Sequence, residues 1–100
     1  MPLTATGLRA DPDVTRKAIA FWMTIDRATS IAPVRVFVTC DALAQMDPSQ
    51  LRDWYGAFET FEHSRSRIED AASQAYDVGG PDEGEYEGQP ILVIRSDDLT

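Results

Sequence analysis

An apolar stripe with helical spacing occupies the second half of this sequence. Its eight positions recur every three or four residues and so share one helix face: Leu51, Trp54, Phe58, Phe61, Arg65, Ile68, Ala72 and Ala75. All of these are apolar except Arg65, which carries a permanent charge. Because an unpaired buried charge is costly, we expect Arg65 to have a carboxylate partner or to lie at an open surface.

Turn and capping residues set the predicted bounds of this helix. Asp47–Gln50 combines a capping acid, a proline at the first helical position and a glutamine three residues after the cap. The glycines and proline of Gly79–Pro81 end the helix, which therefore runs to about Tyr76 or Asp77. Such a helix is roughly 40 Å long at about 1.5 Å per residue, so it overhangs a short strand.

Alternating apolar positions predict strands on both sides of the helix. Ala18–Asp26 and Val34–Thr39 lie close together and favour an antiparallel hairpin. Thr39 can cap a short helix, and Pro90–Ser96 is a compact apolar strand. The predicted fold class is α+β, with an antiparallel sheet of three strands packed by one long helix in the order ββααβ. The sheet has four strands if Tyr86 belongs to an edge strand.

Length and composition favour one small cytoplasmic domain. One hundred residues with 43% hydrophobic content suffice for a single core. Residues 1–13 lack periodicity, so we expect a flexible N-terminal arm followed by a single α+β domain over residues 14–100. The longest apolar run, Ala18–Met23, is far shorter than a membrane span. A single cysteine and the absence of a signal-peptide pattern favour the reducing cytoplasm.

The stripe also fits a heptad with Arg65 at an a position. The flanking positions do not alternate opposite charges, so packing on a sheet is favoured over an ordinary parallel coiled coil. Self-association through the overhanging part of the helix remains open as an addition to that packing. The sequence therefore indicates a homo-oligomer or an unknown protein partner.

Two sets of carboxylates can reach Arg65. Glu62 and Glu69 lie three residues before it and four after it, on the same side of the helix. If the last strand runs antiparallel to the helix, Asp97 and Asp98 also come beside it. We predict a structural ion-pair network of these five residues. The alternative is an arginine whose stem packs while its head reaches water.

The same residues carry a family resemblance. The pattern comprises an aromatic residue near a strand end, a hydrophobic-Thr-x-Asp-Ala-Leu element, a helix with spaced Phe, Arg, Ile-Glu and Ala, and a closing Ser-x-Asp-hydrophobic. The matching residues are Phe21, Val38–Leu43, Phe61, Arg65, Ile68, Glu69, Ala72 and Ser96–Leu99. Over roughly residues 17–99 the chain resembles domain-of-unknown-function family 1488, although Ser64 stands where Asn or His is usual. The resemblance implies small α+β bacterial proteins of unassigned activity, without catalytic residues to transfer.

Cys40 is the candidate reactive thiol. It lies just inside a predicted helix N-terminus, where the helix dipole lowers a thiol pKa. The chain has no second cysteine, and its only histidine, His63, falls on the helix side opposite the stripe. The resemblance places the family cysteine at Val36 instead. A small structural cysteine is therefore the favoured interpretation, and a thiol-based redox sensor or small enzyme is the alternative.

Charge and motifs exclude several other classes. Residues 1–40 carry five basic and three acidic side chains, a net charge of +2. Residues 41–100 carry four basic and fourteen acidic side chains, a net charge of −10, and the two parts sum to the total of −8. This acidity argues against nucleic acid and anionic membranes. A nucleic-acid-binding surface would need aromatic residues to stack on bases, here Trp22 and Phe37, and nearby basic residues, here Arg9, Arg16, Lys17, Arg27 and Arg35. We expect Trp22 and Phe37 to pack under the helix instead.

No metal or cofactor is expected either. The acidic residues Asp82, Glu83, Glu85 and Glu87 lack the spacing of an EF-hand, and neither a phosphate-binding loop nor a catalytic serine motif occurs. The sequence thus predicts a non-catalytic interaction or regulatory module.

Overall fold

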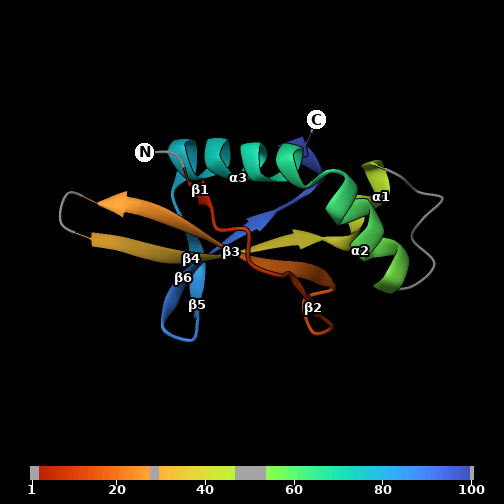
Figure 1. Cartoon of the computed structure of the whole chain (residues 1–100), viewed down its shortest axis with the longest axis horizontal. Coiled ribbons are helices and arrows are strands. Elements are labelled where there is room, and N and C mark those ends of the chain that lie inside the picture. Colours follow the sequence, from red (N-terminus) through yellow and green to blue (C-terminus); the bar gives the residue numbers. More distant parts are fainter. Residues whose placement is uncertain (1–2, 28–29, 47–53, 100) are drawn as a thin grey trace.

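A computed structural model describes residues 3–27, 30–46 and 54–99 of the chain (Figure 1). In chain order the elements are β1 (Thr4–Ala5), β2 (Asp11–Asp13), β3 (Ala18–Arg27), β4 (Ser30–Thr39), α1 (Cys40–Met46), α2 (Trp54–His63), α3 (Arg65–Gly79), β5 (Asp82–Tyr86), β6 (Gln89–Ile94) and the 3₁₀ helix η2 (Ser96–Leu99). Figure 1 shows α3 lying across one side of the sheet, with the β3–β4 hairpin extending past it and the β5–β6 hairpin pointing away from it. The fold class is α+β, as predicted.

The β3–β4 hairpin is the longest part of the sheet. Its strands pair antiparallel from Ala18↔Thr39 to Arg27↔Ser30. The sequence predicts this hairpin but starts the second strand at Val34, whereas β4 begins four residues earlier, at Ser30. The alternation of apolar and polar residues is weak in this part of β4, where Ile31 is exposed. The strand projects beyond the core there, so neither face requires apolar residues.

The sheet is mixed, so the predicted antiparallel sheet in the order ββααβ is wrong in detail. The strand order is β1-β3-β4-β6-β5, and β2 pairs with β3 beside β1. Strands β4 and β6 are parallel, with Arg35 opposite Ile91 and Val38 opposite Ile94. The reason is β5, an antiparallel edge strand that contains Tyr86 and reverses the chain once more before β6.

The predicted single long helix is also wrong, because it is interrupted at Ser64. The backbone there has φ −113° and ψ 16°, and its N–H is shared between the carbonyl oxygens of Thr60 and Phe61 at 3.1 and 3.2 Å. The change of direction lets α2 pack on α1 and β3 while α3 packs on β1 and β6. A straight helix would lose one of these contacts. The helix start predicted at Asp47–Gln50 lies outside the described residues.

The glycines end the helix as predicted, although α3 runs to Gly79, two residues beyond the predicted Asp77. Gly80 follows α3 with a positive φ of 70°, and its N–H donates to the carbonyl oxygen of Tyr76 at 2.8 Å. Thr39 likewise caps α1, because its Oγ1 accepts the N–H of Ala42 at 3.1 Å.

The main core lies between the helices and one face of the sheet. The rings of Phe21 on β3 and Phe61 on α2 are 5.1 Å apart and tilted by 53°. Small side chains at Ala57 and Ala72 let the helices approach the strands. The remaining core is aliphatic: Ile19, Met23, Val34, Val36, Val38, Ile68, Leu92 and Ile94 are fully or almost fully buried.

The opposite face of the sheet carries a second apolar cluster. Ala18, Ala20, Phe37 and Ile91 are buried there, with Tyr86 packed against them. The expectation that Trp22 and Phe37 pack under the helix is therefore wrong. Phe21 and Val36 face the helices, and successive side chains of a strand point to opposite faces of the sheet. Trp22 and Phe37, which follow them in the chain, therefore lie on the face away from the helices.

The N-terminal segment runs along β3. β1 pairs with Met23 and Thr24, and β2 pairs with residues 18–20. Leu3 is buried in the main core, and its carbonyl oxygen accepts the Ser73 hydroxyl at 2.7 Å. The segment for which we predicted a flexible arm thus has defined contacts. Its mobility in solution and the division of the chain at residue 13 stay predictions.

Candidate functional site

Arg65, the charged residue of the apolar stripe, begins α3 beneath the N-terminal segment. Its Cζ lies 5.6 Å from the ring centre of Phe21 and 5.4 Å from that of Phe61. Its Nε is 3.2 Å from Glu69 Oε2, and its Nη1 is 3.7 Å from Glu62 Oε1. The side chain is 17% exposed. Arg65 therefore combines apolar packing with ion pairs to two carboxylates of its own helical region.

A third partner of Arg65 is a backbone group. Its Nη2 donates a hydrogen bond of 2.8 Å to the carbonyl oxygen of Leu8. Sequence reasoning missed this contact, because a main-chain oxygen in an aperiodic segment leaves no pattern in side-chain types. The structure thus places Arg65 between α3 and the N-terminal segment.

The two C-terminal aspartates lie in η2, which packs against α1 and α3. Asp98 Oδ2 accepts the N–H of Arg95 at 2.9 Å, an interaction that caps η2. Arg65 pairs with Glu62 and Glu69 and hydrogen-bonds the backbone of Leu8. A link from Arg65 to Asp97 or Asp98 stays a prediction.

Cys40 begins α1 as expected, but its environment does not favour the thiolate. Burial raises the pKa of its thiol, and the adjacent Asp41 carboxylate raises that pKa further, while the Lys17 ammonium lowers it. The net shift is upward, opposite to the lowering that we expected from the helix dipole. Desolvation is the largest cause of this upward shift, and the negative charge of Asp41 is the second.

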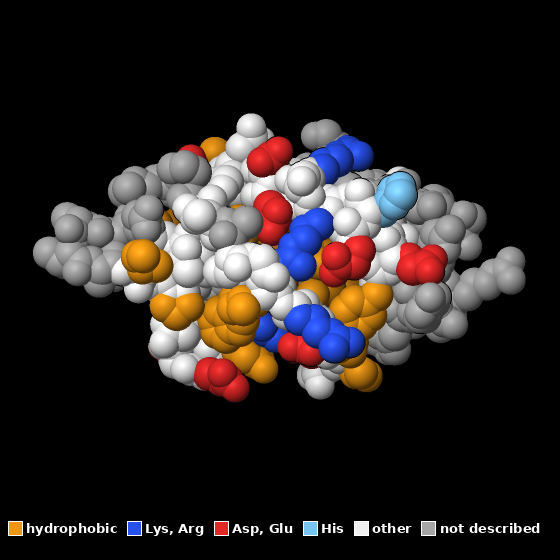
Figure 2. Space-filling view, in the orientation of Figure 1, with side chains coloured by type: hydrophobic (Ala, Val, Ile, Leu, Met, Phe, Trp, Pro, Cys, Tyr) orange, Lys and Arg blue, Asp and Glu red, His pale blue; other side chains and the backbone are white. Residues whose placement is uncertain are grey.

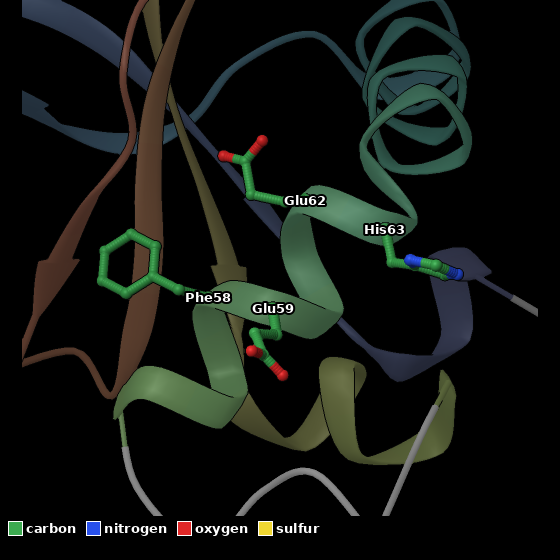
Figure 3. Close-up of a pocket in the computed structure, with 4 residues that line it drawn as sticks. All are labelled: Phe58, Glu59, Glu62 and His63. Carbon is green, nitrogen blue, oxygen red and sulfur yellow. The ribbon is translucent and has the colours of Figure 1, made fainter.

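A pocket of about 490 Å³ lies along α2 and is lined by Phe58, Glu59, Glu62 and His63. Figure 3 shows that these side chains diverge: Phe58 points toward the strands, the two glutamates point apart, and His63 points away from all three. Groups that diverge do not converge on one ligand atom. Among the described residues, no three His, Cys, Asp or Glu side chains are placed to hold a metal ion.

A second pocket, of about 360 Å³, lies where three segments meet, and we call it the hairpin groove. It is lined by Thr6 and Leu8 of the N-terminal segment, Trp22, Thr24 and Pro33 of the β3–β4 hairpin, and Glu87 and Gln89 of the β5–β6 turn. The groove is held in part by Thr6, whose hydroxyl donates to the carbonyl oxygen of Trp22 at 2.8 Å and accepts the Leu8 N–H at 3.1 Å. Figure 2 shows hydrophobic side chains gathered near the β5–β6 hairpin.

Arg35 lies beside the groove on the face away from the helices. Its Cζ is 4.9 Å from the Trp22 ring centre and 4.8 Å from that of Tyr86. Strand pairing puts Arg35 directly opposite Trp22. Arg35 thus lies between the rings of Trp22 and Tyr86, and we call this arrangement the Arg35 sandwich. Strand alternation in the sequence places Arg35 and Trp22 on one sheet face, but it does not reveal the contact with Tyr86.

Helices on one side of a mixed sheet define a two-layer α+β protein. A family model described as "Protein of unknown function (DUF1488)" matches residues 8–87, so the chain belongs to this family, as its resemblance indicated. Comparisons with curated proteins and with solved structures gave no match. None of the helices in the described residues has the length and apolar character needed to cross a bilayer.

Proposed function

We propose that the protein is a non-catalytic interaction module that binds an extended segment of a protein partner in the hairpin groove. The observation that carries this proposal is the unequal pairing of β4. Its ten residues all pair with β3, but β6 covers only Arg35–Val38 on the other side. In the described part of the chain, residues 30–34 of β4 therefore have no strand pairing on that side, and Pro33 among them lines the groove.

An open strand edge next to an apolar pocket suits an extended peptide. Backbone groups of the edge can pair with the peptide, while alternate peptide side chains enter the pocket. Pro33 has no N–H to donate, so recognition here depends more on the apolar surface than in a regular edge strand. Leu8 and Ile31, with 55% and 68% of their surfaces exposed, extend that surface.

The chemistry of the groove also fits a protein segment. Leu8, Trp22 and Pro33 supply apolar contacts, and Trp22 is of a residue type enriched at binding hot spots. Polar groups at Thr24 and Gln89 can hydrogen-bond to a peptide backbone. An apolar centre with polar groups around it is the usual anatomy of a protein interface.

Site-specific photo-crosslinking in cells tests this proposal. A photoreactive amino acid replaces Leu8 in the groove, and a matched one replaces Gln74, an exposed residue on α3. We expect a discrete adduct from position 8 but not from position 74. We further expect Pro33→Asp to abolish that adduct without unfolding the protein. Equal labelling at both positions, or an adduct unaffected by Pro33→Asp, would contradict the proposal.

Self-association through the long helix remains a prediction, although the interruption at Ser64 removes the length argument for it. Light scattering tests it directly. A mass near 11.1 kDa indicates a monomer and a different protein as partner. A dimer that dissociates on Phe58→Asp but not on Leu8→Asp places the contact on α2, whereas the opposite result places a second copy in the groove.

The alternative function, a thiol-based sensor or small enzyme using Cys40, is weakened by the upward shift of the Cys40 pKa. A raised pKa leaves less thiolate, the reactive form, at neutral pH. A cytoplasmic setting for the interaction module fits the single cysteine, and this setting and a bacterial source stay part of the proposal.

A further inference from the structure

Two arginines stack on aromatic rings on the face of the sheet away from the helices. Arg35 lies between Trp22 and Tyr86, as described above. Arg16 has its Cζ 4.5 Å from the ring centre of Phe37, and the Phe37 and Tyr86 rings are 6.0 Å apart. Both cations therefore belong to one continuous cluster of aromatic and guanidinium groups.

Both arginines have their ion-pair partners on the same three-residue strand. Asp11 Oδ2 lies 3.9 Å from Arg35 Nη2, and Asp13 Oδ2 lies 3.8 Å from Arg16 Nε. A close charge-assisted hydrogen bond measures about 2.7–2.9 Å, so both pairs are loose. Asp11 is 68% exposed, whereas the side chain of Arg35 is only 5% exposed.

Arg35 is incompletely compensated in this arrangement. Within the described residues its buried Nε has no hydrogen-bond partner. Burying a guanidinium is costly unless its N–H groups and its charge are matched. The faces of Trp22 and Tyr86 offset part of this cost through cation–π contacts. The guanidinium is therefore incompletely neutralised, and its Nη2, which is 3.9 Å from the exposed Asp11 Oδ2, is the edge that an anion can approach.

Strand β2 is suited to give way to such an anion. It is three residues long, pairs only with β3 among the described strands, and lies at the edge of the sheet (Figure 1). Asp11 and Asp13 can thus leave the arginines with few backbone hydrogen bonds lost. Arginine is also the side chain whose geometry best matches phosphate oxygens.

We infer that Arg35 and Arg16 form a phosphate-binding site that Asp11 and Asp13 of β2 neutralise in this structure. A phosphate group binds the guanidinium edges in place of the aspartate carboxylates. The site does not depend on the hairpin groove, and it is a binding site without a covalent step. Its affinity is limited by competition from the two aspartates.

Titration with inorganic phosphate tests this inference, with sodium chloride keeping the ionic strength constant. The Trp22 indole N–H and the Arg35 Nε–H report binding by NMR. We expect weak saturable shifts in the native chain. In Asp11→Asn/Asp13→Asn the affinity should rise about tenfold, equivalent to about 1.4 kcal/mol. Asparagine can still accept the 3.0 Å hydrogen bond that the Arg16 N–H gives to residue 13, so the turn is preserved.

Two further variants separate the site from general effects. Glu59→Gln/Asp70→Asn removes the same charge from exposed helix positions and should leave the phosphate affinity unchanged. Arg16→Gln, added to the Asp11/Asp13 variant, should reverse most of the gain, and it spares the buried Arg35. The inference is overturned by an equal gain in the Glu59/Asp70 control, by no loss with Arg16→Gln, or by no saturable shift in Asp11→Asn/Asp13→Asn.

Discussion

Arg65 hydrogen-bonds the backbone of Leu8, 57 positions earlier in the chain, through a contact of 2.8 Å from Nη2 to the carbonyl oxygen. The same guanidinium pairs with Glu69 and lies over two phenylalanine rings. A charge that interrupts an apolar stripe thus fastens the N-terminal segment to the helix layer. Its role in the structure is a tie between elements.

Arg65→Met should lower the free energy of unfolding by about 2–3 kcal/mol, because it removes charged hydrogen bonds and leaves the Leu8 carbonyl and Glu69 without their partner. Arg65→Lys keeps the charge but cannot reach both partners, so its loss should be smaller. Urea unfolding gives the totals, and amide exchange should accelerate in residues 3–10 before the β3–β4 hairpin. A change below about 0.5 kcal/mol in Arg65→Met would refute this role. A double-mutant cycle with Asp97→Asn tests the predicted C-terminal tie.

Cys40 should react slowly with iodoacetamide at neutral pH, and its pH–rate midpoint should lie above that of a free cysteine. Asp41→Asn should lower this midpoint and Lys17→Gln should raise it, since Asp41 raises the thiol pKa and Lys17 lowers it. A midpoint below that of a free cysteine would revive the sensor alternative.

The same shift sets the direction of a pH effect on stability. The folded thiol keeps its proton to higher pH than the unfolded thiol, so the folded state binds more protons between the two pKa values. Stability from this group is therefore complete below the unfolded pKa and is lost as the pH rises through the folded one. Cys40→Ser should flatten the decline of the free energy of unfolding above about pH 8.5, the usual cysteine pKa, whereas a steeper decline would contradict the assignment.

Gly80→Ala should destabilise the protein by about 1–3 kcal/mol, because residue 80 has a φ of 70° and a ψ of −166°, a region that is essentially restricted to glycine. Space is not the reason, since an added Cβ meets nothing within 4 Å. Gly79→Ala is the matched control: its Cβ also has open space but its φ is not positive, so stability should hold or rise by up to about 1 kcal/mol. Thermal unfolding of both variants decides, and equal losses would exclude backbone strain.

Asp82→Ala should detach β5 from the sheet. Asp82 Oδ2 accepts the Val93 N–H at 2.7 Å, and its Oδ1 lies 3.9 Å from Arg95 Nη1. Removing the carboxylate leaves that N–H without its acceptor, at a cost of about 1–3 kcal/mol. Asp82→Asn should lose less, and Glu83→Gln, an exposed neighbour, should lose almost nothing. Amide exchange at Val93 that is fastest in Asp82→Ala, slower in Asp82→Asn and unchanged in Glu83→Gln would confirm the assignment, and equal exchange in all three variants would exclude it.

Much of the fold is local and could be predicted. Alternation identified the core-facing residues of β3 and β4, although Trp22 and Phe37 were wrongly expected to pack under the helix. Thr39 marked the start of α1, and Gly80 marked the end of α3. The direction and order of the strands were not predictable. The alternation of apolar and polar residues along a strand shows which side chains share a face, but it does not show which strand lies beside it. β5 was uncertain for a related reason: its acidic residues and Gly84 do not alternate with apolar ones. The interruption of the helix at Ser64 was not predictable either, because the sequence has neither a proline nor a glycine at that position.

The candidate sites divide along the same line. Arg65, Glu62 and Glu69 could be grouped from the sequence because helical spacing places them within reach of each other. Both the hairpin groove and the Arg35 sandwich join strands to segments far away in the chain. Tyr86 contacts Arg35 only because the parallel β4–β6 pairing brings β5 back to this face.

That parallel pairing also governs when the sheet can form. β6 lies between β4 and β5, so this place in the sheet is filled by an element that follows β1–β4 and the helices α1–α3 in the chain. Until residues 89–94 emerge, the inner edge of β4 and the apolar side chains beneath α3 lack a partner. Contacts between positions so distant in sequence slow folding, because the loop must close before the contacts form. The nascent chain therefore passes through a stage in which one edge of β4 is unpaired, and unpaired strand edges favour aggregation.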